Sequence, residues 1–357
     1  MVRTLRNMLQ HGDLSFRDFV EVALYHPEHG YYTRERRPVG KEGDFVTSPH
    51  LSSVFAFTLG KLVREFLSRA GDDVCTVVDI GCGDGRLIRE LAAIGGACYI
   101  GVDRKFVSRE SGVVSRLTTH HSLLTTIDAI PRGGAHLIFS NELFDALPFA
   151  RLVKRGEQLH ELWVDENFEW TEHEAEPRYS DYFESRGIQL ADGQFADVSL
   201  EWEAFYADIA RIVDRGLIVT FDYGYPGTKL FHSRARRFGT AAAYSQQRVT
   251  RDLLANPGEQ DLTAHVNFTD LIRAGEARGF STRFFDRQAK FLLALGATEH
   301  ELFRPVTELE EASIELMQQR DEARQLVLPD GIGHDISVLA QVKSMGEDAW
   351  NFERVLF

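Results

Sequence analysis

The sequence contains few cysteines and no long apolar run, and each absence excludes a class of protein. Three cysteines among 357 residues are too few and too oddly numbered for a disulfide framework, and they do not follow the spacing of a metal site. No run of about eighteen apolar residues could span a membrane, and the N-terminus leads into polar sequence without the apolar core of a secretory signal. We therefore expect a cytoplasmic protein with reduced thiols, no metal site and no membrane partner.

Positive charge is also in short supply. The chain has 40 lysines and arginines against 54 aspartates and glutamates, a net charge of −14, and such a chain repels DNA and RNA on average. Most of the excess lies between residues 157 and 203, where fourteen acids and two bases give a net charge of −12. This acidic segment is either a solvated insertion that maintains solubility or a rim that attracts a basic protein. We expect no nucleic-acid partner.

What the sequence does contain is an alternation of helix-like and strand-like segments. Apolar residues at helical spacing predict helices at about 14–25, 51–70 and 86–93, and short apolar runs predict strands buried on both faces. The strands are expected at 76–80, 98–102, near 117–121, 136–140 and 217–221, with a final pair at 282–285 and 336–342. This order predicts an α/β fold built on a mostly parallel sheet.

The length of the chain allows two domains, or one domain with insertions. Residues 1–70 are mostly helix and loop, too few for a core of their own, and are expected to form an N-terminal helical cap. Residues 71–357 would form the main domain, with insertions at about 151–200, 225–265 and 298–326. We expect hairpins in the first insertion, loops in the second and a Glu-rich helix in the third.

The first predicted strand ends in the turn Gly81-Cys82-Gly83-Asp84-Gly85. Glycine has no Cβ, so such a turn lets a ligand approach the backbone N–H groups at the start of the next helix. A dinucleotide fingerprint requires G-x-G-x-x-G, but Arg86 stands where the third glycine should fall, which disfavours NAD. The alternative is an ordinary turn between a strand and a helix.

The turn instead resembles motif I of the class I S-adenosylmethionine (SAM) methyltransferases. In that family an acid near the end of the next strand holds the ribose hydroxyls, and Asp103 stands at the expected distance. The resemblance implies a Rossmann-like sheet that is mostly parallel and ends in an antiparallel C-terminal edge strand, formed here by the pair at 282–285 and 336–342.

The fourth predicted strand leads into Asn141-Glu142-Leu143-Phe144-Asp145, where methyltransferases that modify nitrogen usually keep their acceptor-site residues. The acid-x-x-acid spacing can place Glu142 and Asp145 on the same side of a turn, and a guanidinium is a natural partner for two carboxylates. The alternative is a helix start, with Asn141 as N-cap and Glu142 beside the positive end of the helix dipole.

A histidine follows in a polar segment, Gln260-Asp261-Leu262-Thr263-Ala264-His265-Val266. Because imidazole titrates near neutral pH, His265 is a candidate for proton transfer. A structural role, with a hydrogen bond to a backbone carbonyl, is at least as good an interpretation. Asn267, just after this segment, is expected to cap a helix.

Six segments in order along the chain resemble the MidA-like family of SAM-dependent methyltransferases, which includes a mitochondrial protein arginine methyltransferase. They are Tyr25-His26-Pro27 with Gly30-Tyr31-Tyr32, Gly43-Asp44-Phe45-x-Thr47-Ser48-Pro49, the glycine turn, Asn141-Glu142-x-x-Asp145-Ala146-Leu147-Pro148, Gln260–Val266, and Leu328-Pro329-x-Gly331-Ile332-Gly333. One departure stands out, because Asp84 occupies a position where this family commonly has arginine, which reverses a charge beside the cofactor.

The resemblance implies SAM as cofactor and assigns roles to matching residues. SAM would be held by Asp79, Gly81, Cys82, Gly83 and Asp103, with the loop that contains Asp44, Thr47, Ser48 and Pro49 closing over its methionine end. The acceptor side would contain Glu142, Asn141, Asp145 and His265 as the catalytic residues.

We expect methyl transfer to an arginine of a partner protein, in a basic segment. A SAM-binding assembly factor without catalysis, or a small-molecule N- or O-methyltransferase, are the alternatives. The sequence does not indicate an oligomeric state.

Overall fold

The computed structural model describes residues 1–33, 47–70, 75–104, 113–118, 121–246, 248–305 and 313–346. The chain forms two compact units, and each is described by itself. Unit 1 comprises Met1–Phe45, Phe144–Ala204 and Tyr223–Leu271, and unit 2 comprises Val46–Leu143, Phe205–Asp222 and Ile272–Phe357. The division into a cap at 1–70 and a main domain at 71–357 stays a prediction.

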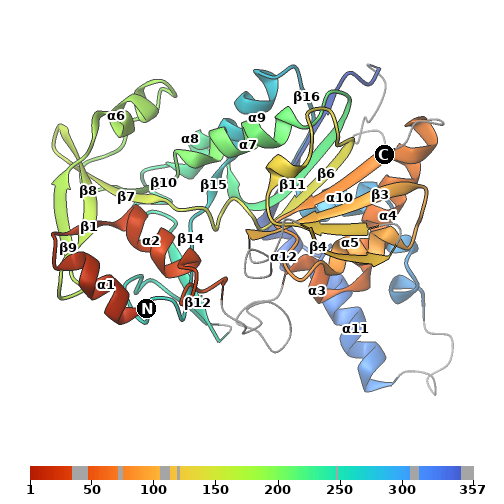
Figure 1. Ribbon diagram of the computed structural model, residues 1–357, viewed down its shortest axis with the longest axis horizontal. Coiled ribbons are helices and arrows are strands. Elements are labelled where there is room, and N and C mark those ends of the chain that lie inside the picture. The colour runs from red at the N-terminus through yellow and green to blue at the C-terminus, as the bar shows by residue number, and fades with distance from the viewer. Residues whose placement is uncertain are drawn as a thin grey trace. The chain divides into compact units, whose positions relative to one another are not determined.

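Unit 2 is built on a sheet in the order β16-β17-β11-β6-β2-β3-β5-β4 (Figure 1). Its strands are β2 (Cys75–Ile80), β3 (Ala97–Val102), β4 (Val113–Thr118), β5 (His121–Leu124), β6 (Leu137–Asn141), β11 (Gly216–Tyr225), β16 (Ser281–Arg287) and β17 (Ile336–Lys343). Neighbouring strands from β11 to β5 run parallel. The pairs β16–β17 and β4–β5 are antiparallel. The predicted α/β sheet, with its antiparallel C-terminal strands, is therefore confirmed.

The apolar runs of the central strands explain why they form the middle of this sheet. Almost every residue of β2, and all of β6 except Asn141, is buried, as expected for strands with helices on both faces. The strand expected near 117–121 is displaced. The chain instead forms the hairpin of β4 and β5, and β5 is the strand that runs parallel to β3.

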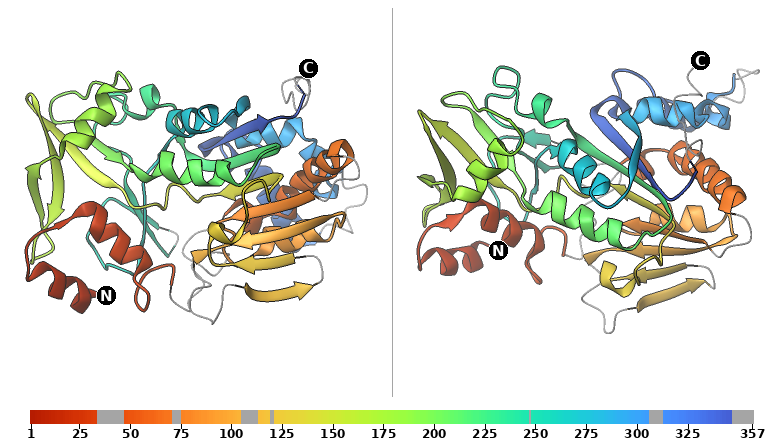
Figure 2. Two further views of the ribbon diagram at one scale, coloured as in Figure 1. Left: turned by 45° about the horizontal axis from the view of Figure 1, so that its top comes forward. Right: turned by 90° about the horizontal axis from the view of Figure 1, so that it is seen from above.

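Helices of unit 2 are α3 (Ser48–Leu51), α4 (Ser53–Ala70), α5 (Arg86–Ala92), α10 (Gln288–Ala294), α11 (Ile314–Gln325) and α12 (Ile332–Asp335), with 3₁₀ turns at Ile127–Ala129, Ala297–Glu299 and Glu301–Phe303. Helix α4 contacts α3, α5 and α10, and Figure 2 shows α4 and α10 side by side. The single helix expected at 298–326 is thus two 3₁₀ turns and α11, with residues 306–312 outside the described part.

Two helices continue from one unit into the other: α7 (Glu201–Arg211) and α9 (Phe268–Glu276). Asn267 accepts a hydrogen bond from the N–H of Thr269 at 3.1 Å and so caps α9, as predicted. None of the helices in the described ranges combines the length and apolar character needed to cross a membrane.

Unit 1 contains a five-stranded antiparallel sheet and a three-stranded one. The first consists of β1 (Leu14–Ser15), β7 (Ala150–Arg155), β8 (Gln158–Val164), β9 (Trp170–Glu174) and β10 (Phe195–Val198), and the second of β12 (Ala242–Ser245), β13 (Arg248–Thr250) and β14 (Asp261–Thr263). A short strand, β15 (Val266–Asn267), pairs with the end of β11. The helices are α1 (Val2–Leu9), α2 (Phe16–Tyr25), α6 (Pro177–Glu184) and α8 (Gly227–Leu230). The hairpins expected at 151–200 are confirmed.

One ion pair holds β7 and β10 together inside unit 1. Arg151 and Asp197 lie opposite each other on these strands, and the guanidinium donates to the carboxylate at 2.6 Å. The other carboxylate oxygen accepts the N–H groups of Thr240 and Ala241 at 2.6 and 2.7 Å. The side chain of Asp197 has no exposed surface, so its charge is balanced entirely by these partners.

Replacing this carboxylate should strongly destabilise unit 1. Asp197→Ala leaves a largely buried guanidinium without its carboxylate and two N–H groups without an acceptor, and breaking a buried pair in this way costs about 3–5 kcal/mol. Denaturant unfolding of the parent and the variant measures the loss. Glu172→Ala, which removes the partner of Arg155 in a more exposed pair between β7 and β9, the two strands that pair with β8, is the matched control and should cost much less. Equal losses in the two variants would contradict the buried-pair interpretation.

Candidate active site

The glycine turn between β2 and α5 has the backbone that the sequence predicts. Gly81, Gly83 and Gly85 have φ angles of 74°, 59° and 78°. Residues other than glycine rarely adopt this backbone region. A Cβ on Gly81 would lie 2.8 Å from the side chain of Leu143. The turn is tied to the next strand, because the N–H groups of Gly81 and Cys82 donate to the carbonyl of Val102 at 2.8 and 3.1 Å.

Three carboxylates surround this turn. Asp103 follows β3 directly and accepts a hydrogen bond from the N–H of Gly83 at 2.8 Å. Asp79 is buried in β2, and burial, together with the charges of Asp103 and Asp84, raises its pKa to about 8. Asp84 has a pKa below its usual range, chiefly because His50 forms a hydrogen bond with it. The turn is therefore a region of concentrated negative charge.

The segment before α4 lies against the same turn. The ring of His50 contacts Thr47 Oγ1 through Nδ1 at 2.9 Å and Asp84 Oδ2 through Nε2 at 3.3 Å. Ser48 is fully buried and donates to Gln288 Oε1 in α10 at 3.1 Å. Within this segment His50 makes the contact with the predicted cofactor turn, Thr47 holds the His50 ring, and Ser48 faces α10. The roles of Thr47, Ser48 and Pro49 toward the cofactor stay predictions. Asp44 lies outside the described residues.

The end of β6 forms a second unusual turn in unit 2. Glu142 has a φ of 50°, which is uncommon for a residue with a side chain. Such a backbone conformation costs about 1–3 kcal/mol and persists only where the surrounding structure holds it. Two hydrogen bonds to β11 hold it here: the N–H of Glu142 donates to the carbonyl of Phe221 at 2.9 Å, and the N–H of Leu143 donates to Asp222 Oδ2 at 3.1 Å.

No helix begins at this point, so the interpretation of Asn141 as a helix N-cap is wrong. The amide of Asn141 instead donates to Glu142 Oε1 at 3.0 Å, while its buried Oδ1 has no hydrogen-bond partner among the described residues. A buried acceptor of this kind usually marks a strained or ligand-binding position. Asp222, which the sequence places at the end of the fifth predicted strand as an alternative to His265 for passing on a proton, accepts the Leu143 N–H here.

Asp145 and His265 belong to unit 1. The N–H of Ala264 donates to the carbonyl of Asp145 at 3.0 Å, which places the two segments next to each other. The His265 ring packs near the rings of Tyr223 and Tyr225, at centroid distances of 6.4 and 5.7 Å. The structure therefore groups Asn141, Glu142 and Asp222 in one unit, and Asp145 and His265 in the other.

Three of the sequence segments that carried the family resemblance meet inside unit 1. The hydroxyl of Tyr25 donates to the carbonyl of Ala146 at 2.8 Å, and that of Tyr32 donates to Asp261 Oδ1 at 2.9 Å. Burial, followed by the nearby charge of Asp261, raises the pKa of Tyr32 well above its usual value. These segments form one hydrogen-bonded cluster, which sequence reasoning did not predict because its members are far apart in the chain.

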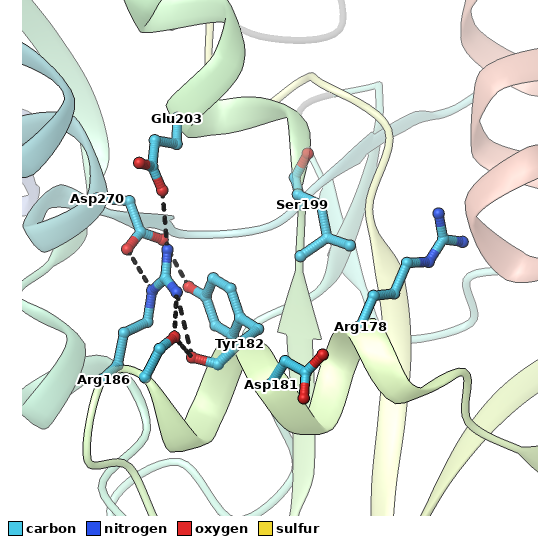
Figure 3. Close-up of a pocket in the computed structure, with 9 residues that line it drawn as sticks. Arg178, Asp181, Tyr182, Arg186, Ser199, Glu203 and Asp270 are labelled. Carbon is cyan, nitrogen blue, oxygen red and sulfur yellow. Dashed lines mark hydrogen bonds and ion pairs between the residues drawn. The ribbon is translucent and has the colours of Figure 1, made fainter.

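A cavity of about 320 Å³ in unit 1 contains none of the predicted site residues (Figure 3). The Arg186 guanidinium is enclosed on one side of it, donating to Asp270 at 2.6 Å and Glu203 at 3.1 Å and stacking over the Tyr182 ring at 3.8 Å. Burial raises the pKa of Asp270, which also accepts the Tyr182 hydroxyl. These groups satisfy one another, so we interpret the cluster as a structural link between α6, α7 and α9.

The chemistry of the glycine turn fits SAM better than a dinucleotide. SAM is cationic at its sulfonium and amino groups, whereas a dinucleotide places a pyrophosphate on the turn. The carboxylates of Asp84 and Asp103 lie at this turn, and negative charge at such close range attracts the first and repels the second. The turn between β2 and α5, at the carboxyl edge of a parallel sheet, is where ligands of α/β proteins bind.

The sheet and this glycine turn together are those of a class I SAM-dependent methyltransferase. The sequence profile of a family described as "Putative S-adenosyl-L-methionine-dependent methyltransferase" matches residues 106–285. Because the match covers half of the chain, the chain belongs to this family, and its cofactor is SAM. The predicted cofactor and family are thereby confirmed.

Solved structures and characterised relatives agree with the family. A crystal structure of a Burkholderia thailandensis protein bound to S-adenosyl-homocysteine is 25% identical, covers 97% of this chain and 92% of its own, and has a TM-score of 0.80. Among relatives, "Protein arginine methyltransferase NDUFAF7 homolog, mitochondrial" of Drosophila melanogaster is 26% identical over 76% of this chain and 69% of its own length. The protein of the same name from Caenorhabditis elegans is 26% identical over 82% and 75%.

The raised pKa of Asp79 predicts how stability depends on pH. Between its ordinary pKa near 4 and its native value of about 8, the folded protein holds a proton that the unfolded chain releases. The parent protein therefore loses stability as the pH rises through this range, and the loss ends above about pH 8. Asp79→Asn should remove this contribution. The free energy of unfolding of the variant, relative to that of the parent, should therefore increase as the pH rises from 5 to 8.

Unfolding midpoints of the ligand-free proteins between pH 5 and 9 measure the difference. Asp128→Asn removes an exposed carboxylate of the same unit and serves as control, with no comparable trend. A difference between Asp79→Asn and the parent that stays constant over this range would show that Asp79 is ionised in the folded protein.

Proposed function

We propose that this methyltransferase transfers the methyl group of SAM to a guanidinium nitrogen of an arginine in a partner protein. The observation that carries the proposal is the strained Glu142, held at the carboxyl end of β6 by hydrogen bonds that its own N–H and the N–H of Leu143 donate to β11. A protein that only bound SAM would gain nothing from the cost of fixing a carboxylate there. The names of the relatives, which call them protein arginine methyltransferases, support the choice of acceptor.

Bound SAM supplies an electrophilic methyl group. The glycine turn Gly81-Cys82-Gly83 would contact it through backbone groups, and the Asp103 carboxylate would accept hydrogen bonds from its ribose hydroxyls. Asp79 would add negative charge below the turn when the bound cation favours loss of its proton. The segment of Thr47, Ser48 and Pro49, with Asp44 before it, would cover its methionine end. Support for this arrangement comes from the contact of His50 with Asp84 in the turn.

The acceptor presents a different difficulty, because a guanidinium is almost always protonated and has little lone-pair density on its nitrogens. The carboxylate of Glu142 would accept N–H bonds from two of these nitrogens, and so hold the positive charge away from the third. It would also take the proton that the attacked nitrogen loses. Asn141, whose amide already donates to Glu142 Oε1, would fix the orientation of this carboxylate.

Asp145 and His265 complete the proposed acceptor side. The buried Asp145 would add a second carboxylate for the guanidinium. His265, packed near two tyrosine rings, would pass the proton onward to solvent.

The acidic segment between residues 157 and 203 supports a basic protein as the acceptor, because its net charge of −12 attracts positive charge. The fourteen acids of this segment include several on β8, β9 and α6 of unit 1. We also propose a cytoplasmic location, for which the support is the low content of cysteine, three residues in 357.

One labelling experiment tests the acceptor directly. The protein is incubated with methyl-labelled SAM and a lysate from cells that lack it, and labelled bands are analysed by mass spectrometry. Label on arginine of a protein is expected. Label on lysine, or on a small molecule alone, would overturn the arginine proposal, and no label at all would favour a SAM-binding assembly factor.

The role of Glu142 gives a separate prediction. Glu142→Gln keeps the shape of the side chain but removes the charge and the proton acceptor, so methyl transfer should fall by at least about a hundredfold. The Kd for SAM should change little, because the glycine turn is untouched. Single-turnover transfer and calorimetric binding measure the two quantities.

Glu65→Gln is the matched control, since it removes an exposed glutamate of the same unit that forms an ion pair with Arg69 on the surface of α4. It should leave methyl transfer unchanged. Undiminished transfer by Glu142→Gln would remove Glu142 from the mechanism.

A further inference from the structure

We propose that His50 and Asp84 act as one pair that positions the segment Thr47–His50 against the glycine turn, and so sets the affinity for the cofactor. The inference rests on the binding of SAM by this turn and not on the identity of the methyl acceptor. Neither residue touches the reacting atoms in this proposal. Both are positioning residues.

The imidazole of His50 is held at both of its nitrogens. Nδ1 contacts Thr47 Oγ1 at 2.9 Å and Nε2 contacts Asp84 Oδ2 at 3.3 Å. The His50 side chain is only 15% exposed. A ring fixed at both ends has one orientation, so it joins the first turn of α3 to the glycine turn as a rigid bridge.

Asp84 is well placed for this task because its second oxygen is used as well. Oδ1 accepts the N–H of Arg86, the first residue of α5, at 3.0 Å. A displacement of the segment at Thr47 is therefore transmitted through His50 and Asp84 to the start of the helix that follows the turn. These contacts connect three elements that are separate in sequence.

The other side of the same segment is also anchored. Ser48 Oγ donates to Gln288 Oε1 at 3.1 Å, and both residues are fully buried. The Nε2 of Gln288 is buried without a partner in the described part of the chain. The segment is thus fixed to α10 by Ser48 and to the glycine turn by His50, and loss of the second contact would leave it attached at one side only.

The charged groups around Asp84 explain why a histidine at position 50 is a suitable partner for it. Asp84 lies beside Arg86 and Arg89 of α5, the latter donating to the Asp84 carbonyl at 2.6 Å, while Asp103 adds negative charge near it. The hydrogen bond with His50 lowers the pKa of Asp84 despite its partial burial. The aspartate in the turn therefore has a specific partner in this chain.

A double-mutant cycle tests the proposal. His50→Ala, Asp84→Asn and the double variant are compared with the parent for binding of S-adenosylhomocysteine by calorimetry. Asp84→Asn retains the oxygen that caps α5. Each single variant should weaken binding about two- to fivefold, the range expected for a partly exposed pair. The double variant should bind no more weakly than the weaker single one.

Three results would overturn the proposal. The first is a double variant whose loss is the product of the two single losses, because independent residues do not act as a pair. The second is coupling in the thermal midpoint of the ligand-free protein with none in the Kd, because this would mean a purely structural contact. Unchanged binding in all three variants has the same consequence.

A matched control exists in unit 1, where His173 Nε2 lies 3.0 Å from Asp13 Oδ2 on the protein surface. The same cycle with His173→Ala and Asp13→Asn should leave the Kd unchanged. Because the readout is binding of the demethylated cofactor, the result stays valid whether or not arginine proves to be the methyl acceptor.

Discussion

The site depends on the register of the parallel strands in unit 2. Ile80 of β2 lies opposite both Val102 of β3 and Ser140 of β6, and Asn141 of β6 lies opposite Phe221 of β11. The residues that follow these positions therefore emerge at the same edge of the sheet. Since successive residues of a strand face opposite sides, a slip of one residue would turn these side chains to the other face.

This register also provides the hydrogen bonds that stabilise the two unusual turns. The carbonyl of Val102 accepts from the glycine turn because β3 ends beside it, and the carbonyl of Phe221 accepts from Glu142 because β6 ends at Asn141 while β11 continues. Each bond links one strand to the loop that follows its neighbour. The strained backbone of Glu142 persists because neighbouring backbone determines it, as is usual at functional positions.

Much of this architecture could be predicted from the sequence, and the reasons differ between elements. β2 and β6 were predictable because buried parallel strands are uninterrupted apolar runs, and α4 because its apolar residues recur at helical spacing. The hairpin of β4 and β5 was misplaced, since its sequence alternates polar and apolar residues without a clear run. Helix α1 escaped notice because only Leu5 and Leu9 are buried in it.

The site was predictable to a similar degree. Residues that follow a strand within a recognisable motif, such as Asp103 and Glu142, were found from spacing. His50 was not, because its partner Asp84 lies 34 positions later in the chain and no local pattern connects them. The strained φ of Glu142 was equally hidden, since it results from β11, a strand about 80 residues further on.

The same edge of the sheet accounts for the electrostatics of the reaction. Both substrates of the proposed transfer are cations, and the turns that would receive them contain the acids Asp84, Asp103 and Glu142, with Asp79 in the strand before the first turn. Burial, together with the charges of Asp103 and Asp84, keeps the proton on Asp79 up to about pH 8. A cation bound beside them favours the ionised form of Asp79, so cofactor binding and loss of this proton reinforce each other. The repulsion between these acids destabilises the ligand-free protein. Binding of a positive ligand relieves this repulsion, which strengthens the binding.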